Sequence, residues 1–452
     1  MINQNDSFEN SQHQFLHAIK ELKIASLLNK TGISKAQGAS AYKVFQFLLL
    51  LVFQGKNLYR FLASKYGETA LSKNTYYRFL NTSTYNWRKF LQLLSVKVIS
   101  VFDCLTRPGR VKSFVLDDSV LNRNRSSSVE LLANTYDHVF HTFVKGFTLL
   151  TLGWTDGYSF IPADFAVLSS SKKANRYQEV SEKIDKRSSG FKRRAEAMSK
   201  KSDAAVQLIH NALTCGIKAD YVLMDTWFTN EPMLKAILKE GLDVIGMVKQ
   251  LKQLYNYKGR YCRLEELRTL LPKNTMGDIL GSVITETKNG INVKLVFVKN
   301  RNKKSEWLVV LSTDLSLSDA EIIRIYGNRW SIEVFFKASK SFMKLGTEFQ
   351  GRSYDMMISH TTIVFTRYII LEWLRRNKND EKTFGELFFL FSDDIQDMDF
   401  TTALQSLMSL FIEQINTVTT EVAETVKRQL QQWITSQASF IQALFGNLSW
   451  ES

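Results

Sequence analysis

A short segment in the C-terminal half of the chain, YGNRWSIEVFFKASK (residues 326–340), constrains the fold more than any other feature. In a helix with about 100° of turn per residue, Tyr326, Arg329, Glu333 and Lys340 fall on one stripe roughly 60° wide. The bulky apolar side chains around that stripe are Ile332, Phe336, Trp330, Val334 and Phe335. A solvated helix face is usually wider than this stripe. A carboxylate among apolar side chains needs a cation or a metal ion as its partner, so the stripe predicts a functional site.

Carboxylates also stand at the ends of two predicted strands. The segment SFVLDDS (113–119) is an apolar strand that runs into Asp117 and Asp118, and ADYVLMD (219–225) ends on Asp225. Open sheets place their ligands at the C-terminal ends of central strands. Three carboxylates repel one another unless a hard cation compensates, and Mg²⁺ takes oxygen ligands and keeps several waters. Two such ions roughly 3.5–4 Å apart stabilise an in-line displacement at phosphorus.

The charge of the chain favours a polyanionic partner. Lys and Arg number 59 against 44 Asp and Glu, so the net charge is 59 − 44 = +15, and the pI is about 9.5. The stretch 172–201 alone carries 11 Lys and Arg against 4 Asp and Glu. Such an excess indicates nucleic acid before a membrane surface. Acidic metal ligands in basic surroundings are the arrangement expected of a nuclease or a strand-transfer enzyme.

Several other classes of protein are excluded by composition. Three cysteines without a CxxC arrangement and six scattered histidines without HExxH argue against a disulfide scaffold and a zinc centre. The first residues lack a secretory signal. The longest apolar run, residues 44–53, is about half as long as a membrane span requires. These features predict a soluble cytoplasmic protein with no membrane partner.

A chain of 452 residues is long enough for two or three domains. The pattern of apolar and polar residues predicts a helical DNA-binding region over 1–110 and a core in two parts, 111–248 and 314–390. A β-rich insertion over 249–313 separates the two parts of the core, and a helical C-terminal region covers 391–452. The C-terminal helices fit a dimer interface and an intramolecular bundle equally well. Residues 57–81 have the shape of a helix–turn–helix, although a plain helical hairpin fits the same pattern. Its second helix would expose polar and aromatic groups, namely Lys73, Asn74, Tyr76, Tyr77 and Arg78.

These motifs together resemble a known family. Tyr326-x2-Arg329-x3-Glu333-x6-Lys340 is similar, in spacing and residue type, to the Y-R-E-K signature of the DDE transposases of bacterial insertion sequences (the insertion-sequence-four family). LDDS, YVLMDTWF and RWSIEVFFK resemble that family's two Asp segments and its Glu segment. The similarity covers roughly residues 113–390.

The resemblance implies an α/β fold, with a ribonuclease-H-like catalytic core interrupted by a β-rich insertion and helical regions at both ends. Its catalytic carboxylates would be Asp118, Asp225 and Glu333, which would bind two Mg²⁺ ions or Mn²⁺. The family pattern places the first Asp directly before Thr or Ser, which favours Asp118. Asp117 stays an alternative, and only one of the two faces the site because successive strand residues point to opposite faces.

The resemblance also implies roles in DNA binding. Trp307 would stack on a base flipped out of the duplex, with a core tryptophan on a strand as the alternative. Arg329 and Lys340 would hold phosphates, and Tyr326 would bond the same backbone, whereas an internal salt bridge to Glu333 is the alternative for the two cations.

For the activity, the resemblance implies cut-and-paste transposition inside a bacterial cell, on the nucleoid. Water cleaves the first strand, the freed 3′-hydroxyl closes a hairpin on the opposite strand, and the reopened end joins target DNA. The partners would be terminal inverted repeats and target DNA, held by a homodimer. Two other functions stay open: a structure-specific nuclease on the same fold, and a non-catalytic DNA-binding protein derived from a transposase.

Overall fold

The computed structural model describes most of the chain between residues 14 and 436. The described ranges are 14–64, 70–107, 109–181, 184–249, 253–271, 277–300, 303, 306–349, 351–378, 382–393 and 420–436. The predicted C-terminal region 391–452 therefore lies largely outside the described residues. Within it, residues 391–393 are helical, and α16 (Thr420–Thr435) is a helix.

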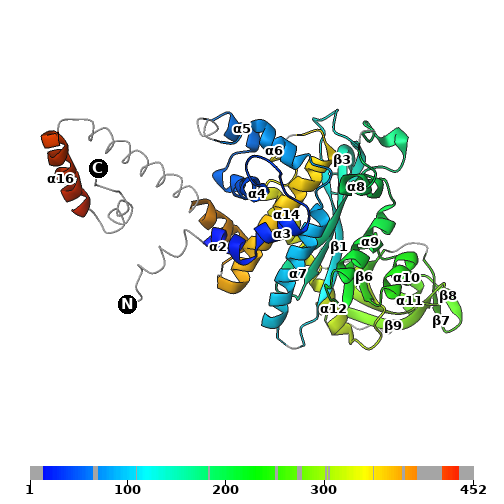
Figure 1. The fold of residues 1–452 in the computed structure, drawn as a ribbon. Helices are drawn as coiled ribbons and strands as arrows, with labels where there is room; N and C mark the ends of the chain where they lie inside the picture. Colours follow the sequence, from blue (N-terminus) through cyan, green and yellow to red (C-terminus); the bar gives the residue numbers. More distant parts are fainter. Residues whose placement is uncertain are drawn as a thin grey trace.

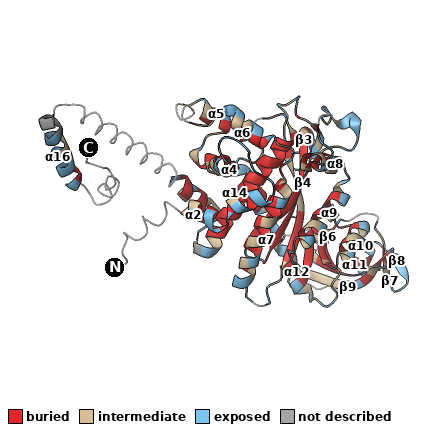
Figure 2. Ribbon diagram, in the orientation of Figure 1, coloured by how far each residue is buried: buried red, intermediate tan, exposed pale blue. Residues whose placement is uncertain are grey.

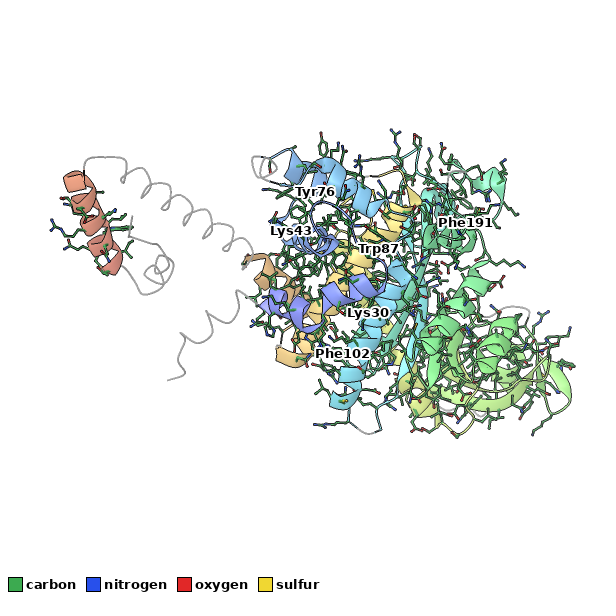
Figure 3. The ribbon with its side chains drawn as sticks, viewed as in Figure 1. Lys30, Lys43, Tyr76, Trp87, Phe102 and Phe191 are labelled. Carbon is green, nitrogen blue, oxygen red and sulfur yellow. The ribbon has the colours of Figure 1, made fainter. Side chains whose placement is uncertain are left out.

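The chain begins with short helices that pack around one long helix. These elements are α2 (Gln14–Glu21), α3 (Ile24–Lys30), α4 (Ala41–Leu50), the 3-10 turn Leu51–Gln54, α5 (Leu58–Leu62), α6 (Lys73–Leu80) and α7 (Trp87–Leu105). Asn86 caps α7 by accepting the Lys89 backbone N–H at 3.0 Å. Trp87 stacks on Phe45 of α4, and Phe102 stacks on Trp373, so both ends of α7 are fixed by aromatic contacts. Figure 3 labels Trp87 and Phe102.

One large mixed sheet forms the centre of the molecule. Its first six strands are β1 (Ser113–Asn122), β2 (Ala133–Asp137), β3 (Thr142–Thr155), β4 (Phe160–Leu168), β5 (Tyr221–Met224) and β6 (Asp243–Val248). β1 pairs antiparallel with β3 and parallel with β5, β4 pairs antiparallel with β3, and β5 pairs parallel with β6. An Asp156-Gly157 turn joins β3 to β4, and Gly157 takes a φ of 82° there.

Helices cover both faces of this sheet (Figure 1). The crossovers that lead to β5 and β6 contain α8 (Ser189–Ala197), α9 (Lys201–Thr214) and α10 (Glu231–Lys239), and α9 packs against α10. α7 and the long helix α14 (Tyr354–Lys378) pack against each other and against β4. Strand β4 is buried along its whole length, and the buried core continues along the sheet and α14 (Figure 2). Among the described helices, none is both long and apolar enough to cross a bilayer.

The β-rich segment after β6 extends the central sheet. It contains β7 (Tyr255–Tyr257), β8 (Arg260–Cys262), α11 (Leu264–Leu270), β9 (Ile279–Thr287), β10 (Asn292–Lys299) and β11 (Trp307–Ser312). β11 pairs antiparallel with β6, and the strand order is β2-β3-β1-β5-β6-β11-β10-β9-β7-β8, with β4 on β3. The predicted β-rich character is present, and its strands continue the sheet of the core.

The helix predicted over residues 326–340 is two helices. α12 (Asp319–Gly327) ends just before Asn328, and α13 (Trp330–Ser341) begins after Arg329. The backbone N–H groups of Asn328 and Arg329 bond three residues back, to Ile325 and Tyr326, which tightens the chain at Gly327-Asn328. Ser318 caps α12 with a capping box, in which Glu321 is the reciprocal partner.

The apolar flanks of that segment also differ from the expectation. Ile332, Phe335 and Phe336 are buried, whereas Trp330 and Val334 are 63% and 47% exposed. α13 therefore packs on the core along one side only. The polar stripe lies between a buried side and an open side that a ligand can approach.

Candidate active site

The strand register brings Asp117 next to Asp225. Leu116 of β1 is paired with Met224 of β5 in parallel register, so Asp117 and Asp225 are the next residues on two neighbouring strands. Adjacent strands lie about 4.8 Å apart, and residues at matched positions of a parallel pair point to the same face. The two carboxylates therefore share one face. Asp225 directly follows β5, but Asp117 lies in the middle of β1, because that strand continues to Asn122 beyond its pairing with β5 and does not end at the aspartates as predicted.

Arg329 joins this pair to Glu333. Its guanidinium donates through Nη1 to Asp117 Oδ2 at 3.0 Å, and through Nη2 to Glu333 Oε1. Asp117 and Glu333, more than two hundred residues apart in the chain, thus bond the same Arg329 guanidinium. The salt bridge to Glu333, weighed from the sequence as an alternative for Arg329, is present together with the bond to Asp117.

The electrostatics of Asp117 show that this cluster is short of positive charge. Burial raises the pKa of the Asp117 carboxyl to about 7; the Arg329 cation opposes this rise, and the charge of Asp225 adds to it. Burial also raises the pKa of Tyr326 to about 12, again against Arg329 and with Asp225. Although burial disfavours a charged guanidinium, Tyr326, Asp117 and Glu333 raise the pKa of Arg329 above its usual range.

Asp118 has a different environment. Lys201 at the start of α9 donates to Asp118 Oδ1 at 2.7 Å, and the same ammonium lies 3.6 Å from the centroid of the Trp227 ring. The partner of Asp117 comes from the junction between α12 and α13, and that of Asp118 comes from α9, as expected when successive strand residues point to opposite faces. Lys201 therefore links β1 to the segment that follows β5, because Trp227 is two residues beyond Asp225.

Lys340, in the last turn of α13, also contacts β1 near the two aspartates. Its ammonium donates to Ser119 Oγ at 2.6 Å, directly beyond the two aspartates. Burial lowers the pKa of Lys340, and the Asp137 carboxylate opposes that effect. Residues of α12, of α13 and of the junction between them thus gather beside the middle of β1 and the end of β5: Tyr326, Arg329, Glu333 and Lys340.

The donor set fits a divalent cation. Carboxylate oxygens are the ligands that Mg²⁺ and Mn²⁺ prefer, and a buried carboxylate whose pKa is raised by a second one requires positive charge beside it. Among the described residues, no three acidic, histidine or cysteine side chains are close enough to hold a metal ion as they stand. Arg329 explains this, since its guanidinium lies between Asp117 and Glu333 and supplies the positive charge itself.

Four predicted DNA contacts lie outside this cluster. Trp307 begins β11, where it is half-buried and its ring contacts Phe297 with centroids 5.4 Å apart. Lys73, Asn74 and Arg78 are exposed on α6, as predicted, and α5 is the helix before it. The predicted exposure of Tyr76 is wrong, because this side chain is buried against Phe47 of α4, and Tyr77 is half-buried. The residues that sequence reasoning did not find are Lys201 and Ser119. Only the position of Ser119 next to Asp118 could have pointed to it.

Two family models match parts of the chain. The family described as DDE superfamily endonuclease matches residues 39–261, and the family described as transposase DDE domain matches residues 195–366. Among curated proteins, none matches the chain. The large mixed sheet with its covering helices is consistent with a ribonuclease-H-like DDE domain, and the two matches include β1, β5 and α13. The chain therefore carries a transposase/endonuclease domain of the DDE superfamily, a family of enzymes that act on DNA.

Proposed function

We propose that this protein is a transposase that cleaves DNA at the ends of its own insertion sequence and joins those ends to a target. The observation that supports it most is the convergence of Asp117 and Asp225, in register on neighbouring strands, with Glu333 through Arg329. The Y-R-E-K spacing and the net charge of +15 add support for DNA as the substrate.

In this proposal the metal ligands are Asp117, Asp225 and Glu333. Two divalent ions, Mg²⁺ or Mn²⁺, would stabilise the attacking and leaving oxygens at the scissile phosphate. Arg329 supplies the counter-charge in the structure described here, and on binding DNA its fork of donors would hold a phosphate. Lys340 and Tyr326 contribute a second cation and a hydroxyl to the same strand, and Trp307 is the proposed stacking platform for a flipped base.

The proposal that Asp117, and not Asp118, is the metal ligand can be tested by changing each residue in turn. We expect Asp117→Asn to abolish cleavage, because it removes a carboxylate that faces Asp225. Asp118→Asn should lower the cleavage rate only about tenfold, because Asp118 would act by positioning its neighbours. The measurement is Mg²⁺-dependent cleavage of a labelled duplex that carries the DNA flanking the gene. If Asp118→Asn abolished cleavage and Asp117→Asn did not, Asp118 would be the ligand.

Glu333→Gln tests whether the site is catalytic. This change removes the ionised carboxylate but keeps the size of the side chain, so cleavage should stop while binding to the end duplex persists. Binding is measured by gel shift in Ca²⁺, and cleavage in Mg²⁺. Unimpaired cleavage by the variant would exclude Glu333 from the reaction, and a wild-type protein that binds but never cleaves would favour the non-catalytic alternative.

The joining step separates a transposase from a nuclease on the same fold. A precut end with a free 3′-hydroxyl is incubated with supercoiled target DNA and the wild-type protein. Joined products would support transposition, and a hairpin at the excised end on a denaturing gel would support the hairpin route. Cleavage of the intact end without joining of the precut end would favour a structure-specific nuclease. A terminal-repeat complex with two copies of the chain would support the proposed dimer.

A further inference from the structure

The turn between β2 and β3 exposes apolar side chains where turns are usually polar. Val139 and Phe140 in the turn are 79% and 76% exposed, and Phe143 at the start of β3 is 70% exposed. Turn positions of this kind usually carry Gly, Asn, Asp or Ser. Exposed apolar side chains that cluster at one point mark an interaction surface. We call residues 136–143 the hairpin tip.

The hairpin tip is fixed in shape by its own contacts. Tyr136 and Phe143 are paired across the strands, and their rings pack edge to face with centroids 5.1 Å apart. The Asp137 carboxylate accepts the backbone N–H groups of Val139 and Phe140 at 2.9 and 3.3 Å. The turn is thereby held in one conformation with two apolar side chains at its apex.

The strand that carries the hairpin tip also passes the carboxylate site. β3 pairs with β1 from Thr155 to Gly146 and then continues beyond β1 into the hairpin. Thr151, the partner of Asp117, and Thr142 are nine residues apart, which is at most about 30 Å along a strand. The charge of the Asp137 carboxylate opposes the lowering of the Lys340 pKa by burial, and the Lys340 ammonium bonds Ser119 of β1. The hairpin therefore lies beside the polar stripe at Asp137, the last residue of β2.

Cations flank this apolar tip. Arg125 is exposed on the loop after β1, and Lys145 lies on β3 next to that loop, where the Asn124 side chain accepts its backbone N–H at 2.8 Å. The Lys145 ammonium lies over the Tyr177 ring, 4.9 Å from its centroid, and Lys340 is a third cation close to the hairpin. Apolar side chains between cations suit DNA, which offers phosphates outside and base faces inside. A second copy of a chain with net charge +15 suits this surface less well, because it brings like charge.

We propose that the hairpin tip is an apolar wedge that contacts base pairs of duplex DNA held at the carboxylate site, with Val139 and Phe140 in the groove. This rests on the proposed function. Since a duplex rises about 3.4 Å per base pair, the contact falls within about nine base pairs of the scissile phosphate. Lys340 and Arg125 hold the phosphates on either side of it.

Photocrosslinking tests the position and the partner. The full chain is prepared with p-benzoyl-phenylalanine in place of Phe140, and a control carries it in place of Tyr261, which is 52% exposed on β8. Both are irradiated with a duplex that carries the DNA flanking the gene. A DNA adduct from position 140 alone, within about nine base pairs of the cleaved phosphate, supports the wedge. A protein–protein adduct, no adduct, or equal adducts from both positions overturns it.

Affinity gives a second measurement. The double change Val139→Ala and Phe140→Ala should weaken duplex binding about tenfold, because each aromatic contact with a base contributes that much. Phe140→Trp should keep the affinity, and Ile284→Ala, which truncates an exposed side chain on β9, should not change it. Unchanged affinity of the double variant overturns the wedge. A wild-type protein that binds no DNA would instead contradict the proposed function, so the two failures are distinguishable.

Discussion

Asp117 and Asp118 are neighbours in β1 but have different partners. This difference separates the proposed metal ligand from a residue that positions it. Asp117 faces Asp225 and Arg329, whereas Asp118 bonds Lys201 on the other face. Lys201 also lies over Trp227, so one ammonium connects the middle of β1 to the segment that follows β5. Asp118 and Lys201 can therefore fix the relative position of Asp117 and Asp225 without touching the substrate.

A double-mutant cycle tests this positioning role. Lys201→Met and Asp118→Asn should each lower the cleavage rate about tenfold, and the double variant should fall no further, because both remove the same link. Lys200→Met is the matched control, since Lys200 is exposed and its side chain does not cap α9. Losses that multiply in the double variant would contradict a shared role, and thermal unfolding of each variant shows whether the fold is intact.

At the scale of elements, α14 contains a buried histidine that must stay neutral in the folded protein. His360 accepts the Gly346 backbone N–H through Nε2 at 2.8 Å, and its ring packs edge to face on Phe349. Burial lowers the pKa of His360 well below its usual value, and the charges of Arg123 and Arg367 act in the same direction. The unfolded chain takes up this proton near pH 6.5, but the folded chain does not.

Stability should therefore fall as the pH falls through about 6.5, because the unfolded state binds more protons. One proton contributes at most about 1.4 kcal/mol per pH unit. The free energy of unfolding is measured by denaturant titration at pH 7, 6 and 5 for the wild type and His360→Gln. We expect a smaller acid loss in the variant. His17→Gln, a change at an exposed histidine, is the control and should follow the wild type.

Sequence patterns predicted the elements of the site better than its contacts. The strands before Asp117 and Asp225 and the Asp156-Gly157 turn follow from apolar runs and turn chemistry, which are local signals. The choice between Asp117 and Asp118 depends on which residue of β1 stands beside Asp225, and that register is set by strand pairing far along the chain. The break at Asn328 and the contact of Lys201 likewise depend on packing, which the sequence does not display.

At the scale of the whole molecule, one buried side chain connects the N-terminal helices to the core. Arg367 of α14 is fully buried and bonds Glu348, and it donates to the backbone oxygens of Leu48 and Leu49 in the last turn of α4. Those carbonyl groups have no partner within their own helix. Arg367 thus stabilises the end of α4 and the charge of Glu348 at the same time.

Arg367→Met should destabilise the protein by about 3–5 kcal/mol, because it leaves Glu348 buried without its partner. The double variant Arg367→Met with Glu348→Gln should recover part of that loss. Arg187→Met is the control: Arg187 is 92% exposed in its pair with Asp185, and such a pair contributes less than about 1 kcal/mol. The measurement is the free energy of unfolding, and a loss of similar size in both single variants would contradict this assignment.

The pairing of β11 with β6 has a further consequence for how such a chain can be shortened. Four residue pairs, from Val309↔Val248 to Ser312↔Ile245, provide β6 with its outer neighbour. A truncated version without residues 249–313 would leave the backbone N–H and C=O groups along that side of β6 open to pairing with other molecules. Shortened derivatives of this protein would therefore aggregate, unless a replacement strand or charged side chains protected the exposed edge of β6.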